Sequence, residues 1–130
     1  ADEVDAARTA AVALARFLAD HATDGQAAVA VSGGVDLVTD GATVYRLPGG
    51  SPMMTKITGA GCSLGGITAV YLAVADPLTA ALAASLLYNR AGEAAAAVAN
   101  GPGSFQVALL DALWNTGPER IADAPMNIEL

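Results

Sequence analysis

The segment from Thr58 to Ser63 holds the residues of this chain that are best suited to chemistry. Its sequence is Thr58-Gly59-Ala60-Gly61-Cys62-Ser63, and an apolar stretch typical of a helix follows it. Residues this small allow the backbone to approach a ligand closely. If Gly61 or Cys62 opens the helix, the N–H groups of its first turn and its dipole form an anion site. Such donors stabilise a phosphoryl group during transfer, so the segment predicts a phosphate-handling turn.

Cys62 occupies the position in this turn from which a side chain could take a proton from an attacking hydroxyl. The N-terminus of a helix also favours the thiolate form of a cysteine. A tight turn with an inert buried cysteine is the alternative interpretation, and the spacing by itself leaves both open. The turn is not a P-loop, because no Gly-Lys-Ser/Thr follows, and a dinucleotide fingerprint would require glycine at Leu64.

The composition favours one packed domain in a reducing compartment. Of the 130 residues, 54% are hydrophobic and 15% are charged, which is too apolar for a disordered chain. The net charge of −7 and the six scattered Lys and Arg residues argue against nucleic acid as a partner. Cys62 and His21 are the only cysteine and histidine, which excludes an intrachain disulfide and a Cys/His metal site. We therefore expect a cytoplasmic protein.

Neither a signal peptide nor a membrane partner is expected from the sequence. The N-terminus from Ala1 to Asp5 is acidic and lacks the basic region of a signal peptide. The most apolar stretch runs from Leu64 to Tyr88, but Asp76-Pro77 interrupts it near its middle. Two buried helices joined by a turn explain this stretch better than a transmembrane helix does.

Periodicity predicts four elements before the glycine turn. A helix is expected over Val4–Leu18, because Ala, Leu and Val dominate one of its faces. The continuously apolar run Ala27–Val31 is typical of a strand that is buried on both faces. Asp40-Gly41-Ala42 supplies turn residues between two extended runs, which predicts a hairpin of Val35–Thr39 and Thr43–Leu47.

The chain after the hairpin is predicted to be mainly helical. A loop at 48–52 and a short extended segment at 55–58 lead to the glycine turn, and the helix after this turn is expected to reach about Ala75. Asp76 is a suitable N-cap for a helix from Pro77 to about Ala99. Ser104 can cap a last helix that extends to about Trp114, whereas the tail from Gly117 has no clear period.

The order of these elements is that of an α/β protein, but it looks incomplete. One buried strand and one hairpin cannot cover the apolar faces of four helices. Further strands must come from another chain or from another part of the same protein. The isolated 130 residues are therefore expected to be inactive, and to aggregate or to pair with a partner that supplies the strands.

Four ordered segments resemble hydroxyethylthiazole kinases, which belong to the ribokinase-like superfamily. The glycine turn resembles the superfamily's anion-hole motif, in which the position of Cys62 is usually an aspartate that acts as the catalytic base. Cysteine at that position is characteristic of hydroxyethylthiazole kinases. Residues 29–36 resemble the family's strand-end motif, and residues 56–58 precede the anion hole as they do there. Residues 101–105 and 109–113 resemble the family's last helix.

The resemblance implies a fold and an activity. It covers nearly all of the chain but only about half of a family member, so residues 1–130 would be the C-terminal half of a single ribokinase-like kinase domain. The family uses ATP to phosphorylate the primary alcohol of 5-(2-hydroxyethyl)-4-methylthiazole in thiamine salvage. Mg²⁺ is expected with ATP. Members of the family are homotrimers, with the thiazole site between subunits.

The resemblance also implies roles for individual residues. Cys62 would act as the base or would position the substrate hydroxyl. Gly59 would contact the thiazole, and Ser32 would contact ATP. The backbone of Gly59, Ala60, Gly61 and Cys62 would hold the phosphoryl group. The family's acidic residues for Mg²⁺ lie in its other half, so no metal ligand is expected in this chain.

For several residues, a structural role stands beside or in place of a functional one. Gly34 stands where family members often have glutamate, which weakens any expectation of polar contacts there. Ser32 and Asp36 could serve only to shape the end of a strand. Arg90 lies within a long predicted helix, where a surface or interface role is favoured over a phosphate contact. Trp114 is expected to pack the final helix.

Two other functions stay open at this point. One is that of another ribokinase-like kinase, acting on a hydroxymethylpyrimidine or on pyridoxal, although Cys62 in place of aspartate argues against it. The other is that of a non-catalytic fragment, which keeps the fold without turnover. A second β/α half elsewhere in the protein would favour the enzyme.

Overall fold

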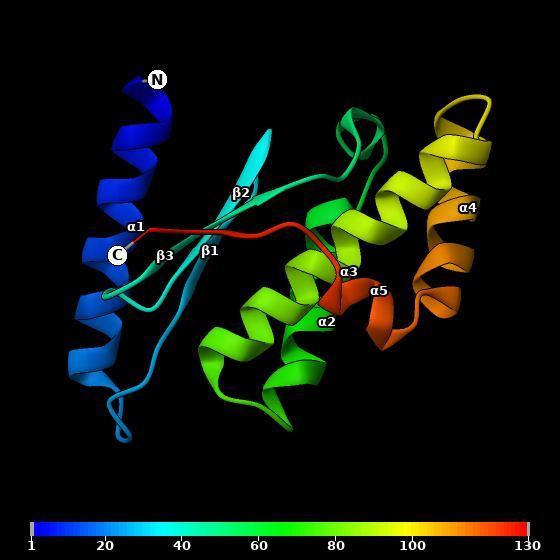
Figure 1. The fold of residues 1–130 in the computed structure, drawn as a ribbon. Coiled ribbons are helices and arrows are strands. Elements are labelled where there is room, and N and C mark those ends of the chain that lie inside the picture. Colours follow the sequence, from blue (N-terminus) through cyan, green and yellow to red (C-terminus); the bar gives the residue numbers. More distant parts are fainter. Residues whose placement is uncertain (1, 130) are drawn as a thin grey trace.

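The computed structural model describes residues 2–129, and its N-terminal part packs one long helix against a sheet (Figure 1). Helix α1 spans Asp2–His21 and contacts strands β1 and β2. Its buried Ala11 packs against Leu37 and Val44 of the sheet. A side chain as small as alanine lets the helix and the sheet approach each other closely.

Four antiparallel strands form the sheet in the order β1-β2-β3-β4. Their bounds are Val29–Val31 (β1), Val35–Thr39 (β2), Val44–Pro48 (β3) and Asn127–Glu129 (β4). Asp40 closes the β2–β3 turn, because its Oδ1 accepts hydrogen bonds of 2.9 Å from both Ala42 N and Thr43 N. The strand that completes the sheet, β4, comes from the far end of the chain.

The two faces of the sheet pack against different helices. Leu37 and Val44 face α1, whereas Val38 and Leu47 pack in a separate cluster with residues of α3. This division follows from the alternation of side chains along a strand. The sheet therefore lies between α1 and the helices that follow it in sequence.

The rest of residues 2–129 contains one short 3₁₀ helix and four α-helices. Their bounds are Pro52–Lys56 (η1), Ala60–Leu72 (α2), Pro77–Val98 (α3), Pro102–Asn115 (α4) and Pro118–Ala122 (α5). Helix α3 is central, with α2 and α4 packed against it (Figure 1). Asp76 caps it by accepting a hydrogen bond from Thr79 N at 3.1 Å. Within residues 2–129, no helix is long and apolar enough to cross a membrane.

The C-terminal segment crosses back to the sheet and is held there by charged side chains. Glu129 in β4 accepts hydrogen bonds from Arg46 Nε and from Arg8 Nε, the latter at 2.9 Å. The bond from Arg46 is the main reason why the pKa of Glu129 lies below its ordinary value. Arg90 in α3 donates to two backbone carbonyl oxygens in and just after α5, at 3.2 and 3.0 Å. These contacts give Arg90 a structural role.

The predicted α/β class is confirmed, and so are most of the predicted elements. The hairpin and the helices expected at 4–18, 77–99 and 104–114 are all present, with ends shifted by a few residues. Ser104 contributes to the start of α4 from inside the helix, where its Oγ accepts a hydrogen bond of 2.9 Å from Asn100 N.

Some predictions on single elements are wrong. The strand expected at 27–31 is only β1, and it is partly exposed rather than buried, because within residues 2–129 it pairs along one edge with β2 alone. Only part of the region 55–58 is extended. Thr55 and Lys56 lie in η1, which is begun by Ser51 Oγ accepting from Met53 N at 3.2 Å, whereas Ile57 after it has extended backbone angles. Helix α2 ends at Leu72, earlier than expected. The tail without a period forms α5 and β4.

Trp114 does not pack the final helix, because its side chain is 90% exposed. Phe105 and Leu109 occupy the buried face of α4. Trp114 follows Phe105 by nine positions, which places it on the opposite side of a helix with 3.6 residues per turn. With Val107 and Leu110 it leaves an apolar outer surface on α4.

Candidate functional site

Helix α2 begins directly after a glycine in the left-handed conformation. Gly59 has a φ of 85° and a ψ of 5°, which side chains disfavour, and Ala60 is the first helical residue. The helix therefore starts one residue before the predicted start at Gly61 or Cys62. Ala60, Gly61 and Cys62 form its first turn, in which backbone N–H groups have no partner inside the helix. Together with the helix dipole, these donors can bind an anion.

The space in front of this turn is open. A β-carbon built on Gly59 or on Gly61 would meet no atom of another segment within 4 Å. Internal packing therefore does not account for the glycine at 61, whose φ is not positive. Close approach of a ligand to the backbone does account for it. Cys62 is exposed, which removes the alternative of a buried structural cysteine.

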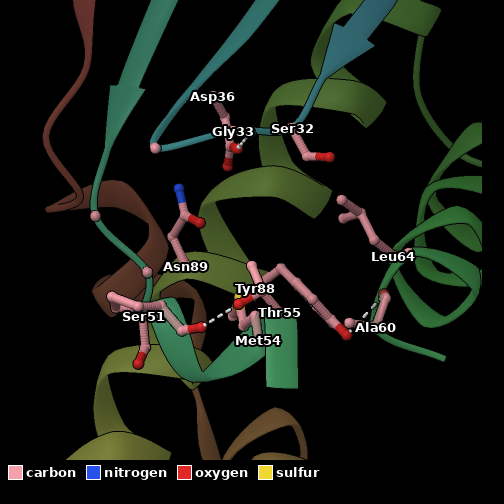
Figure 2. Close-up of a pocket in the computed structure, with 15 residues that line it drawn as sticks. Ser32, Gly33, Asp36, Ser51, Met54, Thr55, Ala60, Leu64, Tyr88 and Asn89 are labelled. Atoms are coloured by element: carbon pink, nitrogen blue, oxygen red, sulfur yellow. Dashed lines mark hydrogen bonds between the residues drawn. The ribbon is translucent and has the colours of Figure 1, made fainter. Parts of the chain in front are cut away.

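A cavity of about 540 Å³ lies beside the turn, at the junction of four segments (Figure 2). Its wall is formed by the β1–β2 turn, the loop that leads into η1, the first turn of α2 and the middle of α3. The polar and backbone groups that matter most are those of Ser32, Asp36, Ala60, Gly61, Tyr88 and Asn89. The volume is within the usual range for small-molecule sites.

A second cavity of about 360 Å³ adjoins the first. The two share Ser32, Asp36, Gly61 and Leu64 in their walls. Through Gly61, the first turn of α2 therefore borders both cavities. This arrangement suits a reaction in which two molecules exchange a group at one point.

Tyr88 ties the first turn of α2 to the central helix. Its ring is buried in α3, and its hydroxyl donates a hydrogen bond of 2.8 Å to the carbonyl oxygen of Ala60 (Figure 2). Burial raises the pKa of Tyr88 above its ordinary value, and a hydrogen bond with the Ser63 side chain opposes this shift in part. The hydroxyl thus stays protonated and keeps its role as donor at neutral pH.

Replacing Tyr88 with phenylalanine should loosen this turn without changing the fold. Loss of one buried hydrogen bond should lower the free energy of unfolding by about 1 kcal/mol. Turnover should fall roughly tenfold, because small shifts of a positioning element are costly. Denaturant titration and steady-state kinetics check both values, with Tyr71→Phe near the other end of α2 as control. Normal turnover in Tyr88→Phe would limit Tyr88 to a purely structural role.

The β1–β2 turn brings Ser32 and Asp36 to the cavity. Asp36 shapes the turn itself, because its Oδ1 accepts a hydrogen bond of 2.9 Å from Gly33 N. Burial raises the pKa of Asp36 above its ordinary value, although the Gly33 hydrogen bond and the Asn89 amide act in the opposite direction. Ser32 lies at the rim, where its hydroxyl can reach a ligand. Gly34 also lines the cavity, so the missing glutamate leaves that side of the rim without a side chain.

The structure brings most of the predicted site residues together. Ser32, Ala60 and Gly61 line the same cavity. Gly59 and Cys62 flank Ala60 and Gly61 in the chain but do not belong to the cavity wall. Sequence reasoning missed the wall residues contributed by α3, for which the only signal was a pair of polar residues, Tyr88 and Asn89, in an alanine-rich helix.

The described residues do not by themselves assemble a metal centre. Residues 2–129 contain no group of three or more His, Cys, Asp or Glu side chains placed to hold a metal ion. Asp36 provides the one carboxylate among the residues that line the 540 Å³ cavity. A divalent cation at this site would depend on ligands from bound phosphates or from elsewhere.

Comparison with known proteins points to one family. The family model described as Hydroxyethylthiazole kinase family matches residues 2–119. A relative named hydroxyethylthiazole kinase from Bifidobacterium animalis subsp. lactis is 69% identical over 126 residues, which are 97% of this chain and 42% of the relative. One of the same name from Cereibacter sphaeroides is 46% identical over 121 residues, or 93% of this chain and 44% of the relative. The chain thus spans less than half the length of these relatives.

A solved structure agrees with the sequence relatives. It is described as the structure of a hydroxyethylthiazole kinase protein from Pyrococcus horikoshii OT3, and it matches with a TM-score of 0.85 at 29% identity. The match covers 99% of this chain and 48% of that one. Taken with the glycine turn at the start of α2, these matches show that the chain belongs to the hydroxyethylthiazole kinase family.

Proposed function

We propose that the protein containing this chain uses ATP to phosphorylate the primary alcohol of 5-(2-hydroxyethyl)-4-methylthiazole, a step of thiamine salvage. The observation that carries the proposal is the turn from Gly59 to Cys62, which opens α2 beside the 540 Å³ cavity. Membership of the family favours the thiazole alcohol over a hydroxymethylpyrimidine or pyridoxal as substrate.

In this proposal the first turn of α2 handles the phosphoryl group. The N–H groups of Ala60, Gly61 and Cys62 stabilise the charge that the group carries during transfer. The Cys62 side chain takes the proton of the attacking hydroxyl or positions that hydroxyl. Gly59, which precedes the cavity-lining Ala60 in the chain, contacts the thiazole, and Ser32 in the cavity wall contacts ATP. The presence of two adjoining cavities beside the first turn of α2 supports separate places for donor and acceptor.

We also propose that Mg²⁺ accompanies ATP, since kinases bind this ion through substrate phosphates, one or two carboxylates and several waters. The described residues do not fit a complete Mg²⁺ site, because Asp36 is the only carboxylate in the cavity wall. By family resemblance, the protein is a cytoplasmic homotrimer.

Residues 1–130 are, in this proposal, the C-terminal half of a single ribokinase-like kinase domain. The large exposed apolar side chains support this, since Val70 is 71% exposed, Val74 84% and Trp114 90%. Apolar surfaces of this extent are normally covered by another part of the protein or by a partner. The share of the relatives that the chain covers points the same way.

The isolated 130 residues are expected to show no thiazole kinase activity. They contain the phosphate-binding turn and a candidate base, but no complete Mg²⁺ site and few strands to cover the helices. The test is to purify this segment and to measure ADP release with ATP and the thiazole alcohol. The same assay with a co-expressed N-terminal half of the Bifidobacterium animalis relative should restore activity. Full activity from a monomer of the segment alone would contradict the half-domain proposal.

The proposed activity itself is tested with the gene product that contains this chain. ADP release should depend on the thiazole alcohol, and mass spectrometry should find the phosphate on its primary hydroxyl. Hydroxymethylpyrimidine and pyridoxal serve as competing acceptors in parallel reactions. Faster turnover with either of these would assign the protein to another kinase activity.

A further inference from the structure

Asn89 carries a buried donor that the fold leaves without a partner. Its side chain is 6% exposed in the middle of α3, and its Nδ2 makes no hydrogen bond with the residues that the structure describes. It is the only buried side-chain nitrogen or oxygen in residues 2–129 with this property. An unsatisfied buried amide costs free energy, and asparagine is also a poorer helix former than the alanines around it. No hydrogen bond within residues 2–129 offsets this free-energy cost.

The Asn89 amide lies between the turn at Gly50 and Asp36. Its Oδ1 lies against the turn at Gly50, where a β-carbon would be only 2.9 Å from that oxygen. Gly50 has a φ of 78° and is itself held by Glu93, whose Oε1 accepts from Gly50 N at 3.2 Å. The Nδ2 end points toward Asp36, which lines the same cavity (Figure 2).

Asp36 places an acceptor on the same side of the cavity. One of its carboxylate oxygens accepts from Gly33 N, and the other is left for a further donor. The Asn89 amide is near enough to lower the pKa of this carboxyl, but it does not complete a hydrogen bond with it. Both residues line the 540 Å³ cavity, so together they offer one donor and one acceptor to a ligand.

A ligand that matches this pair must carry an acceptor and a donor close together. The phosphates of a nucleotide carry only acceptors at neutral pH, and the first turn of α2 already offers donors for them. The nucleoside carries both kinds of group, in the edge of its base and in its sugar hydroxyls. The donor of Asn89 and the acceptor of Asp36 therefore complement the hydrogen-bonding groups of a nucleoside.

We propose that Asn89 and Asp36 recognise the nucleoside of the phosphoryl donor, with Asn89 Nδ2 donating to it and the free oxygen of Asp36 accepting from it. This inference rests on the proposed kinase function for the identity of the donor. Bound nucleotide would then extend from the first turn of α2 to the middle of α3. The buried amide thereby gains, on binding, the partner that it lacks in the free chain.

The experiment compares ATP with inorganic tripolyphosphate, which lacks a nucleoside, as ligands of the gene product that contains this chain. Asn89→Leu keeps the side-chain volume and removes the donor. It should weaken ATP binding about tenfold, as measured by calorimetry, and leave tripolyphosphate binding unchanged. Its melting temperature should stay the same or rise, because an apolar group replaces an unpaired amide. A merely structural residue would instead lower stability and weaken both ligands together.

One further variant tests the role of Asp36, and another serves as a control. Asp36→Asn retains the acceptor for Gly33 N but replaces the free oxygen by a donor, so it should also weaken ATP and spare tripolyphosphate. Asn115→Ala, at the exposed end of α4, is the matched control and should change neither ligand. GTP and 2′-deoxy-ATP show whether the base or the sugar is contacted, because the corresponding preference should vanish in Asn89→Leu.

The outcomes separate this inference from the proposed function. Normal ATP binding in Asn89→Leu, or equal weakening of ATP and tripolyphosphate, would overturn the inference even if thiazole phosphorylation is found. Nucleoside-dependent binding that Asn89→Leu abolishes would support the inference even if the thiazole alcohol is not a substrate. A wild-type protein that binds no ATP would overturn both.

Discussion

Replacing Cys62 with alanine is expected to reduce phosphoryl transfer at least about a hundredfold, the usual scale for loss of a positioned base. The side chain is exposed at the third position of α2, beside the N–H groups that face the phosphoryl group in our proposal. The free energy of unfolding should change by less than about 1 kcal/mol, because an exposed thiol at a helix terminus contributes little packing. Steady-state kinetics and denaturant titration measure the two effects separately.

Two further substitutions at the same position identify what the thiol does. Cys62→Asp introduces a carboxylate, which can accept the proton of the attacking hydroxyl, and it should recover much of the turnover. Cys62→Ser keeps a small polar group but is a much weaker base, so it should resemble the alanine variant in rate. Wild-type turnover in Cys62→Ala would exclude Cys62 from the reaction.

A valine at Gly61 is expected to lower kcat/KM for ATP and for the thiazole alcohol at least about a hundredfold, because it places a branched side chain where the phosphoryl group must approach. Gly61 belongs to the walls of both cavities, so both substrates should be affected. Stability should hardly change, since a β-carbon at this position meets no atom of another segment and valine is not a poorer helix former than glycine.

The matched control for this variant lies five residues further along the same helix. Gly66 is also helical and open, because a β-carbon added there would meet no neighbouring atom within 4 Å, but it belongs to neither cavity wall. Gly66→Val should therefore keep normal kinetics and normal stability. If Gly61→Val also behaves like the wild type, the turn is only a connection between the preceding loop and α2.

Local sequence determined the elements whose signals lie within a few residues. Asp76 and Pro77 define the start of α3, because a side-chain cap and a fixed φ act on the adjacent backbone alone. Asp40 defines the β2–β3 turn in the same way, through hydrogen bonds to residues two and three positions later. The glycine turn that opens α2 was predicted with an error of one residue, because Gly59 and Gly61 restrict the conformations of their own segment.

Contacts between distant segments were decided by the tertiary structure. The tail becomes β4 because Glu129 pairs with Arg8 and Arg46, which lie 121 and 83 positions away in the chain. Trp114 is exposed because the opposite face of α4 is the one that meets α3. No local pattern encodes either outcome, since each depends on which surfaces the folded chain brings together.

The site shows the same division. The types and spacing of the residues from Gly59 to Cys62 singled out the glycine turn in the sequence, and the resemblance to the family's strand-end motif singled out Ser32. Only the fold placed Tyr88 under the first turn of α2, and Asn89 beside Asp36 at the cavity. Tyr88 and Ala60 are 28 positions apart, so their hydrogen bond depends on how α2 packs against α3. The glycine turn is thus a property of local sequence, whereas the cavity beside it is a property of packing.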